Sequence, residues 1–269
     1  MAKVRNLMEV EGRIKNLSFY TMEGCDQIIV RTKGGPSKYK VKHDPKFAVV
    51  RKNNIEWSGC TQMSKIIFNT LKDLFRLADY PVIGTLNAVC KSIQTQDTES
   101  EHGARGLYLT KYGKVLEGFT PNKRRILEQT IQVLPEYTVD RDGMCAQVSF
   151  PAIQPEYQLT NVRNLPYFRL IATLGAISDV YLAKNGKSYD SYKGVLPYTR
   201  KLQISDWLST NAPAEPQNFQ LKFDDVYKED FTVNQSLILG IGVEFGKENA
   251  IQQIEPVKHS GSARLLKVF

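Results

Sequence analysis

The chain has 269 residues, with 36 basic and 28 acidic side chains, a formal net charge of +8 and 42% hydrophobic residues. This composition excludes a disordered or fibrous protein and indicates a globular one, long enough for one large or two modest domains. Charges interrupt the first 17 positions, and no apolar run approaches the roughly 18 residues of a membrane span. We therefore expect a cytoplasmic protein without membrane insertion, unless a dedicated machine or cell lysis exports it.

The positive charge is concentrated in one block, residues 31–65, which holds nine basic and two acidic residues. Its net charge of +7 compares with +8 for the whole chain. Charge distributed this unevenly indicates either a face that binds an acidic partner or the contact through which copies of the protein join.

The N-terminal region predicts a β-hairpin. Residues 13–20 and 27–32 are β-like runs separated by a turn-forming segment. The hydrophobic phase changes between Ile14 and Leu17, which indicates a bulge near Asn16.

An irregular arm and a helix are predicted next. Residues 33–42 contain two glycines, a proline and four lysines, so we expect no regular structure there. Asp44 before Pro45 is an N-cap candidate with proline in the first helical position, which predicts a helix running toward Trp57. The dipeptide at 58–59, Ser-Gly, is expected to interrupt or kink it.

Two further amphipathic helices are predicted at residues 63–75 and 82–93, because apolar residues recur there at steps of three and four. Joined by a short connection, they make a helical hairpin. We expect a loop over 97–105 and a short β-hairpin over 107–119, whereas 124–134 fits either a helix or a connector.

The C-terminal part predicts antiparallel β-structure, because short β-like runs alternate with Pro, Gly and Asn. The expected strands are 145–150, 167–174, 177–183, 200–206, 219–224, 237–245 and 263–268. In strand 237–245 the apolar residues alternate with Gly240 and Gly242, which indicates close approach by a neighbouring backbone.

These elements predict an α+β fold: an N-terminal β-hairpin plus helical hairpin module, followed by an antiparallel β-sandwich. The division is placed at residue 142, because residues 1–142 have a net charge of +7 and residues 143–269 a net charge of +1.

No catalytic, phosphate-binding or metal-binding motif is present, so we expect neither an enzyme, nor a cofactor, nor a metal. The four cysteines lie far apart and fit buried free thiols. The densest acidic group, at 224–230, is interpreted as a solvated turn after a strand.

The candidate interface or polyanion-binding residues all lie in the basic block. They are Arg31, Lys33, Gly34, Gly35, Pro36, Lys38, Tyr39, Lys40, Lys42, Lys46, Arg51, Lys52, Asn53, Asn54 and Trp57. Their lysines and arginines suit phosphates and their aromatics suit base stacking, which makes nucleic acid the alternative partner. An acidic patch on a neighbouring copy, with 97–101 as the candidate, would satisfy the same charge.

The stretch from Gly12 to about Leu74 resembles a group of uncharacterised Bacteroidota proteins. The resemblance rests on GRIKNLSFY, VRTKGGPSK, a Pro-x-Phe at Pro45, RKNNIEWSG and a downstream lysine. It implies an N-terminal block joined to a β-rich C-terminal half, with no assigned activity. Lys52 and Trp57 depart from the acidic residue and the phenylalanine of that pattern.

We therefore predict a non-enzymatic structural protein that self-associates into a filament, tube or ring through its basic arm and β-sandwich. One alternative is a nucleic-acid-associated or phage-derived structural protein that uses the same basic block. Another is a carbohydrate- or peptide-binding β-sandwich, for which exposed aromatics in 189–198 would provide contacts.

Overall fold

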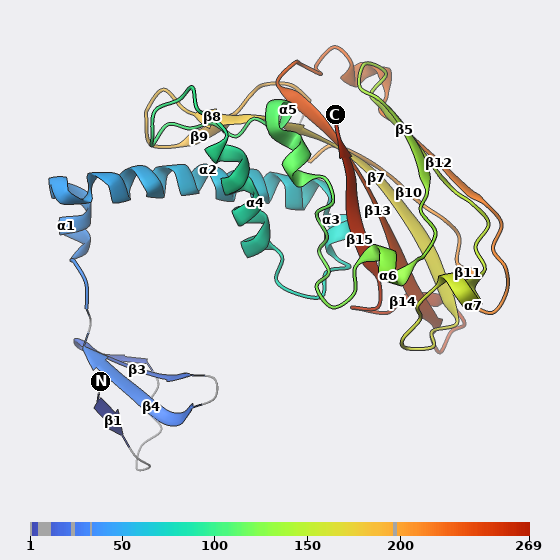
Figure 1. The fold of residues 1–269 in the computed structure, drawn as a ribbon, viewed down its shortest axis with the longest axis horizontal. Helices are drawn as coiled ribbons and strands as arrows, with labels where there is room; N and C mark the ends of the chain where they lie inside the picture. Colours follow the sequence, from blue (N-terminus) through green and yellow to red (C-terminus); the bar gives the residue numbers. More distant parts are fainter. Residues whose placement is uncertain (1, 5–11, 23–24, 33, 196–197) are drawn as a thin grey trace. The chain divides into compact units, whose positions relative to one another are not determined.

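The computed structural model describes residues 2–4, 12–22, 25–32, 34–195 and 198–269, and it divides into two compact units, Met1–Arg51 and Lys52–Phe269 (Figure 1). The predicted mixed α+β class is confirmed: an N-terminal β-hairpin is followed by helices and then by a β-rich C-terminal half. The division at residue 142, drawn from composition, stays a prediction.

The described elements follow a simple order, in which short strands precede helices and most of the remaining strands come last. They are β1 (Ala2–Val4), β2 (Gly12–Ile14), β3 (Leu17–Met22), β4 (Cys25–Thr32), α1 (Lys38–His43), η1 (Pro45–Phe47), α2 (Ala48–Thr70), α3 (Lys72–Phe75), α4 (Ile83–Thr95), α5 (Leu109–Tyr112), η2 (Gly113–Leu116), α6 (Leu127–Thr130), β5 (Glu136–Asp140), β6 (Cys145–Phe150), α7 (Pro155–Gln158), β7 (Tyr167–Ser178), β8 (Val180–Leu182), β9 (Tyr189–Ser191), β10 (Arg200–Ile204), β11 (Leu208–Ser209), β12 (Gln217–Lys222), η3 (Asp225–Tyr227), β13 (Gln235–Glu248), β14 (Ile254–Pro256) and β15 (Ser262–Val268).

The first unit contains a four-stranded antiparallel sheet of order β1-β4-β3-β2. Its central pair, β3 and β4, is the predicted hairpin. The expected bulge near Asn16 is wrong, because Ile14 pairs with Leu17 across a two-residue turn in which Lys15 has φ 52°. The tip of the β3–β4 hairpin, at 23–24, lies outside the described residues.

The lysine-rich arm is partly helical, which corrects the expectation of an irregular segment. Helix α1 begins at Lys38 because the Ser37 hydroxyl accepts a hydrogen bond from the Lys40 N–H at 3.2 Å. The next start signal is confirmed: the Asp44 carboxylate accepts from the Lys46 N–H at 2.9 Å, and Pro45 opens η1, which leads into α2.

Helix α2 runs without a break through Ser58 and Gly59, so the predicted interruption is wrong. Gly59 is required for packing instead of flexibility. A Cβ atom there would lie 2.7 Å from Cε1 of the Tyr189 ring, which comes from β9. The glycine is therefore explained by its contact with Tyr189, and not by a break in the helix.

A six-stranded antiparallel sheet organises the second unit. Its central path is β10-β7-β13-β14, with β11 also paired to β7 and β15 to β13, and it curls into a half-barrel (Figure 1). The two strands expected at 167–174 and 177–183 correspond to β7, which extends to Ser178, and β8, so the break lies at Asp179. A three-stranded sheet, β12-β6-β5, and the hairpin β8-β9 complete the β-structure described in this unit.

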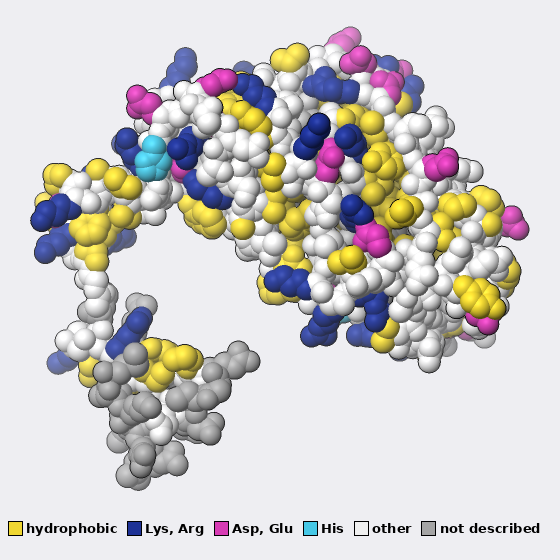
Figure 2. All heavy atoms as spheres, in the orientation of Figure 1, with side chains coloured by type: hydrophobic (Ala, Val, Ile, Leu, Met, Phe, Trp, Pro, Cys, Tyr) yellow, Lys and Arg dark blue, Asp and Glu magenta, His cyan; other side chains and the backbone are white. Residues whose placement is uncertain are grey.

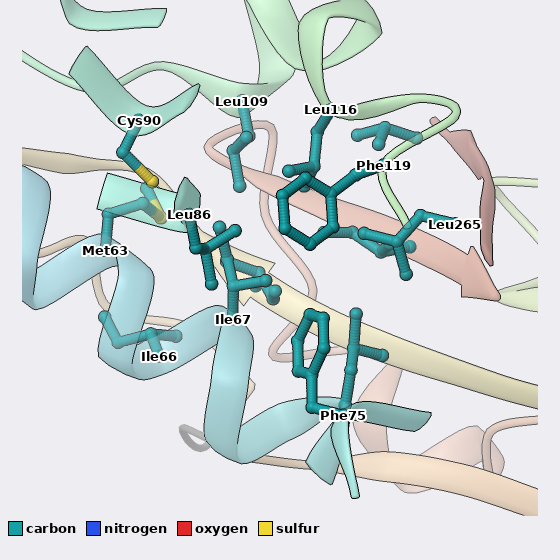
Figure 3. Packing of buried hydrophobic residues seen from close by; sticks show 14 of the residues in the cluster. Met63, Ile66, Ile67, Phe75, Leu86, Cys90, Leu109, Leu116, Phe119 and Leu265 are labelled. Atoms are coloured by element: carbon teal, nitrogen blue, oxygen red, sulfur yellow. The ribbon is translucent and has the colours of Figure 1, made fainter. Parts of the chain in front are cut away.

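The two faces of the curled sheet belong to two buried clusters. Leu237, Leu239, Ile241, Val243 and Phe245 share a cluster with residues of the three-stranded sheet, which confirms the predicted alternation. The opposite face of the sheet packs against the helices. In this cluster Leu265 of β15 lies with Ile67, Phe75 and Leu86 from α2, α3 and α4, and with Phe119 (Figure 3).

Gly240 and Gly242 lie on the helix-facing side of β13. A Cβ atom at Gly242 would lie 2.9 Å from Cδ1 of Leu77, and one at Gly240 would meet Leu74. The closest approach thus comes from side chains of the α3 region, and the predicted neighbouring backbone follows, with the Arg264 and Ser262 carbonyls at 3.3 and 3.2 Å from the same Cβ positions.

The expected hairpin over 107–119 is wrong, because α5 and η2 occupy it. The cause is a distant carboxylate: Asp179 accepts hydrogen bonds from the Thr110 N–H at 3.2 Å and from its hydroxyl at 2.5 Å. This interaction satisfies a donor in the first turn of α5. In the undecided segment 124–134, α6 forms a single turn.

Candidate functional site

The structure distributes the predicted interface residues over both compact units. Arg31, Gly34, Gly35, Pro36, Lys38, Tyr39, Lys40, Lys42, Lys46 and Arg51 belong to the first unit, and Lys52, Asn53, Asn54 and Trp57 to the second. Lys33 lies outside the described residues. Of the described set, only Arg51 is not exposed.

Within the first unit, the basic block presents a lysine surface on α1 and η1. Lys38, Lys40, Lys42 and Lys46 are exposed, and no described residue forms an ion pair with any of them. We call these four side chains the lysine arm. Residues 31–51 contain seven basic residues and one acidic residue, for a net charge of +6.

Arg51 is half-buried and makes hydrogen bonds within the first unit. One terminal nitrogen of its guanidinium donates to the Val41 carbonyl and to the Asp44 carbonyl, each at 2.9 Å. These carbonyls lie at the C-terminal end of α1, where a cation is favourable, and the Asp44 carbonyl also accepts from the Phe47 N–H at 3.0 Å. Arg51 therefore fixes the end of the lysine arm.

The first unit also has an apolar sheet face, which sequence analysis missed. Phe19 pairs with Val30 and Ile14 with Leu17, so these side chains share one face, and Ile28 joins them two residues from Val30. We call Ile14, Leu17, Phe19, Ile28 and Val30 the apolar face. Ile14 is 53% exposed and the other four are half-buried, and none of the five belongs to a buried hydrophobic cluster of the described residues.

The other face of the same sheet is mixed, because Ile29 lies on it and is 4% exposed, beside polar and aromatic side chains. Ser18 pairs with Arg31 there, and the Arg31 guanidinium lies 5.5 Å from the centroid of the Tyr20 ring. The sequence carries only part of a signal for the apolar face, because Leu17 and Phe19 flank Ser18 but Ile28, Ile29 and Val30 form an unbroken apolar run. The pairing register of β2, β3 and β4 is needed to show that these side chains share one face.

In the second unit, two of the predicted residues hold a loop. The Asn53 side-chain oxygen lies 2.8 Å from His102 Nε2. The methylenes of Lys52 pack against Gly103 so closely that a Cβ atom on this glycine would lie 2.8 Å from Lys52 Cγ. Asn54 and Trp57, which is 46% exposed, have no polar or ring contact with any described residue.

Behind Trp57 lies a buried ionic network centred on Glu56, which is 1% exposed. Its carboxylate accepts from Lys91 Nζ at 2.6 Å and from the Gly103 N–H at 2.8 Å. Burial alone would raise the pKa of Glu56, but the hydrogen bonds and positive charges outweigh it and the pKa lies below its ordinary value. The network joins α2, α4 and the 97–106 loop.

In the acidic candidate at 97–101, Glu99 and Glu101 are exposed, and Glu99 lies 3.6 Å from Lys111 Nζ, whereas Asp97 is bonded within the loop. Asp97 is 3% exposed, and its carboxylate accepts from the N–H groups of Glu99, Ser100 and Gly106. An acidic surface forms elsewhere, from two segments that the sequence separates by about 80 residues.

This second surface, which we call the acidic end, comprises Asp140, Asp142, Asp224, Asp225, Glu229 and Asp230, all exposed. The Phe223 N–H donates to the Met144 carbonyl at 3.1 Å, which brings the two segments together, and acidic side chains gather there in Figure 2. Residues 140–142 and 222–230 hold six acidic and three basic residues, for a net charge of −3. Val226 and Val233, each 79% exposed, lie in the same loop region.

Contacts of Arg141 tie the two segments of the acidic end together, through residues that directly follow the second segment. The Arg141 guanidinium donates to the carbonyls of Thr232 and Gln235, at 3.2 and 2.8 Å, and lies 4.8 Å from the centroid of the Phe231 ring. Asp224 and Asp225 pair with Lys201 and Lys228, whereas Asp142, Glu229 and Asp230 have no ion pair among the described residues.

The described residues contain no group of three or more His, Cys, Asp or Glu that could hold a metal ion. Cys60 and Cys90 are buried free thiols, and burial raises their pKa values to about 11 and about 12. No described helix has the length and apolarity to cross a membrane. Tyr189, expected to be exposed, is 4% exposed and donates to the Arg105 carbonyl at 2.7 Å.

Comparisons with family models, with curated proteins and with solved structures give no match to this chain.

Proposed function

We propose that this chain is a non-enzymatic structural protein that self-associates head to tail. In each contact, the N-terminal unit of one copy binds the acidic end of the next copy. The observation that supports this most strongly is the apolar face of the N-terminal sheet, because a small sheet needs a cover on its hydrophobic face to be stable.

The two surfaces are complementary in charge and in polarity. The lysine arm belongs to a segment of net charge +6, and the acidic end to segments of net charge −3. The acidic end also exposes Val226 and Val233, which can cover part of an apolar sheet face. Opposite potentials accelerate encounter and fix the register, while apolar burial provides most of the affinity.

A contact between two different surfaces has a geometric consequence. Head-to-tail contacts build a ring when the rotation between copies closes, and a filament or tube when it does not. In this proposal the C-terminal half acts as a β-sandwich, because Phe150 and Phe219 of the three-stranded sheet share a buried cluster with Phe168 of the curled sheet.

Binding of nucleic acid is the competing use of the lysine arm. Tyr39 is 72% exposed, which would suit base stacking, although its ring already lies 4.5 Å from that of His43. Self-association is preferred because nucleic acid would satisfy the lysines and leave the apolar face uncovered.

Light scattering of the purified full chain, coupled to size exclusion, tests the proposal over a range of concentration and salt. We expect a mass above 30.5 kDa that rises with concentration and falls as salt increases. Monomers under every condition would reject self-association. A high ratio of absorbance at 260 to 280 nm that disappears on nuclease treatment, with monomers remaining, would favour nucleic acid instead.

A further inference from the structure

A second basic site lies far from the lysine arm in sequence, in the second unit. A cavity of about 440 Å³ is lined by three arginines, Arg124, Arg125 and Arg163, together with His259 and the single carboxylate of Asp79. Lysine and arginine side chains gather over the loops in this part of the molecule, below α6 (Figure 2). Self-association as proposed above does not use this cavity.

The wall that contains Arg124 and Arg125 is held by buried hydrogen bonds. Asn122 is 2% exposed, and its side-chain nitrogen donates to the carbonyls of Leu77 and Gly261, at 2.8 and 3.2 Å. Its side-chain oxygen accepts from the Ala263 N–H at 3.0 Å. The segment that follows Asn122 is therefore fixed before any ligand arrives, which reduces the entropic cost of binding.

The Asp79 carboxylate is bonded to the loop backbone. It accepts hydrogen bonds from the backbone N–H groups of Lys123 and Arg124, at 2.9 and 2.8 Å. No ion pair joins it to an arginine of the described lining. The lining thus has three permanent positive charges and one carboxylate that is already used by the loop.

The opposite wall is equally fixed. The Arg163 guanidinium donates to the Lys258 carbonyl at 3.0 Å, and the Asn161 side chain makes two hydrogen bonds to the backbone of Leu165. His259 Nδ1 lies 3.0 Å from the Ala78 carbonyl. A guanidinium has five N–H donors, so one carbonyl leaves Arg163 with donors for a ligand.

We propose that this cavity binds a small phosphate monoester. Planar guanidinium groups match phosphate oxygens in pairs, and three of them beside one carboxylate give a net positive lining that favours a dianion over a single carboxylate. The cavity volume falls within the range of about 300–1,000 Å³ that is usual for small-molecule sites. A phosphate attached to an organic group, such as a sugar phosphate, therefore suits it better than a bare phosphate ion.

Calorimetric titration of the full chain with ribose 5-phosphate tests this site. We expect saturable one-to-one binding, undetectable binding of ribose, and a loss of affinity of at least about tenfold in the Arg124→Gln/Arg163→Gln double variant. Lys187→Gln, which removes an exposed charge elsewhere, should bind like the wild type. Arg124→Gln alone, at an exposed position, provides the same test if the double variant does not fold.

Absence of saturable binding by the wild type, or unchanged binding by the folded arginine variants, would overturn the proposal. So would a single-stranded oligonucleotide that binds at these arginines and that ribose 5-phosphate does not displace. The mass measured by light scattering should not change in the arginine variants, so failure here is distinguishable from failure of the self-association proposal.

Discussion

Gly59 and Tyr189 are packed so closely that no side chain fits between them: a Cβ atom on Gly59 would lie 2.7 Å from Cε1 of the tyrosine ring. The hydroxyl of that ring donates to the Arg105 carbonyl, which holds the ring in place. This contact joins the middle of α2 to β9 and explains a glycine within a 23-residue helix.

We predict that Gly59→Ala destabilises the protein by about 1–3 kcal/mol. Displacing the Tyr189 ring costs more free energy than alanine gains over glycine in helix propensity. Gly84→Ala is the matched control. Gly84 also lies in a helix but has no atom within 4 Å of its would-be Cβ, so alanine should stabilise by about 0.5–1 kcal/mol. Urea unfolding followed by circular dichroism measures both, and equal effects of the two substitutions would contradict the packing argument.

Glu56→Gln should lower the free energy of unfolding at pH 7 by about 1–3 kcal/mol, since Lys91 loses its buried anionic partner. The pKa of Glu56 is depressed in the folded state, so its charge stabilises the fold above the unfolded pKa. This contribution is lost as the pH falls from about 4.3 through the lower folded value. The stability difference between wild type and Glu56→Gln should therefore shrink below that pH, and a difference that is constant from pH 7 to pH 3 would be inconsistent with the depressed pKa.

The apolar face leads to a paired prediction within one strand. Phe19→Glu places a charge on this face and should abolish self-association, whereas Ser18→Glu places the same charge on the opposite face, beside Arg31, and should leave association intact. Light scattering measures the mass, and circular dichroism checks that the second unit remains folded. Similar masses for the two variants would show that the apolar face does not contribute.

The lysine arm should control the salt dependence of assembly. Replacing Lys38, Lys40, Lys42 and Lys46 by glutamine should weaken association strongly at low salt and reduce its sensitivity to salt. The control replaces four other exposed lysines of the second unit, Lys184, Lys187, Lys193 and Lys247, by glutamine. If both quadruple variants weaken association equally, the effect reflects net charge instead of a specific surface.

Local signals predicted some elements well. Asp44 and Pro45 mark a helix start because a cap and a fixed φ act within a few residues, and the alternation in β13 reflects the two faces of a single strand. The errors arise where distant residues decide the structure. Asp179 caps the turn at Thr110 from 69 positions away, and Tyr189 requires Gly59 from 130 positions away.

The candidate surfaces also divide into those that local sequence shows and those that form only from distant segments. The lysine arm was visible as a charge run in the sequence. Only part of the acidic end was visible, as the acidic group at 224–230 that was interpreted as a solvated turn, because its meeting with 140–142 depends on the pairing of β6 with β12. The tripeptide at 123–125 was a visible charge run, but its cavity needs Arg163 and His259 from loops that the fold brings together.

The central claim is that the lysine arm of one copy binds the acidic end of another, and charge reversal tests it most directly. One variant has Lys38, Lys40, Lys42 and Lys46 changed to glutamate, and a second has Asp142, Glu229 and Asp230 changed to lysine. Each variant alone brings like charges together, whereas a mixture of the two restores opposite charges at every contact.

The decisive measurement is the mass by light scattering of each variant alone and of their equimolar mixture at low salt. We predict monomers for each variant separately and higher-order species for the mixture. Assembly of either variant alone at the wild-type level, or a mixture of two folded variants that stays monomeric, would contradict it.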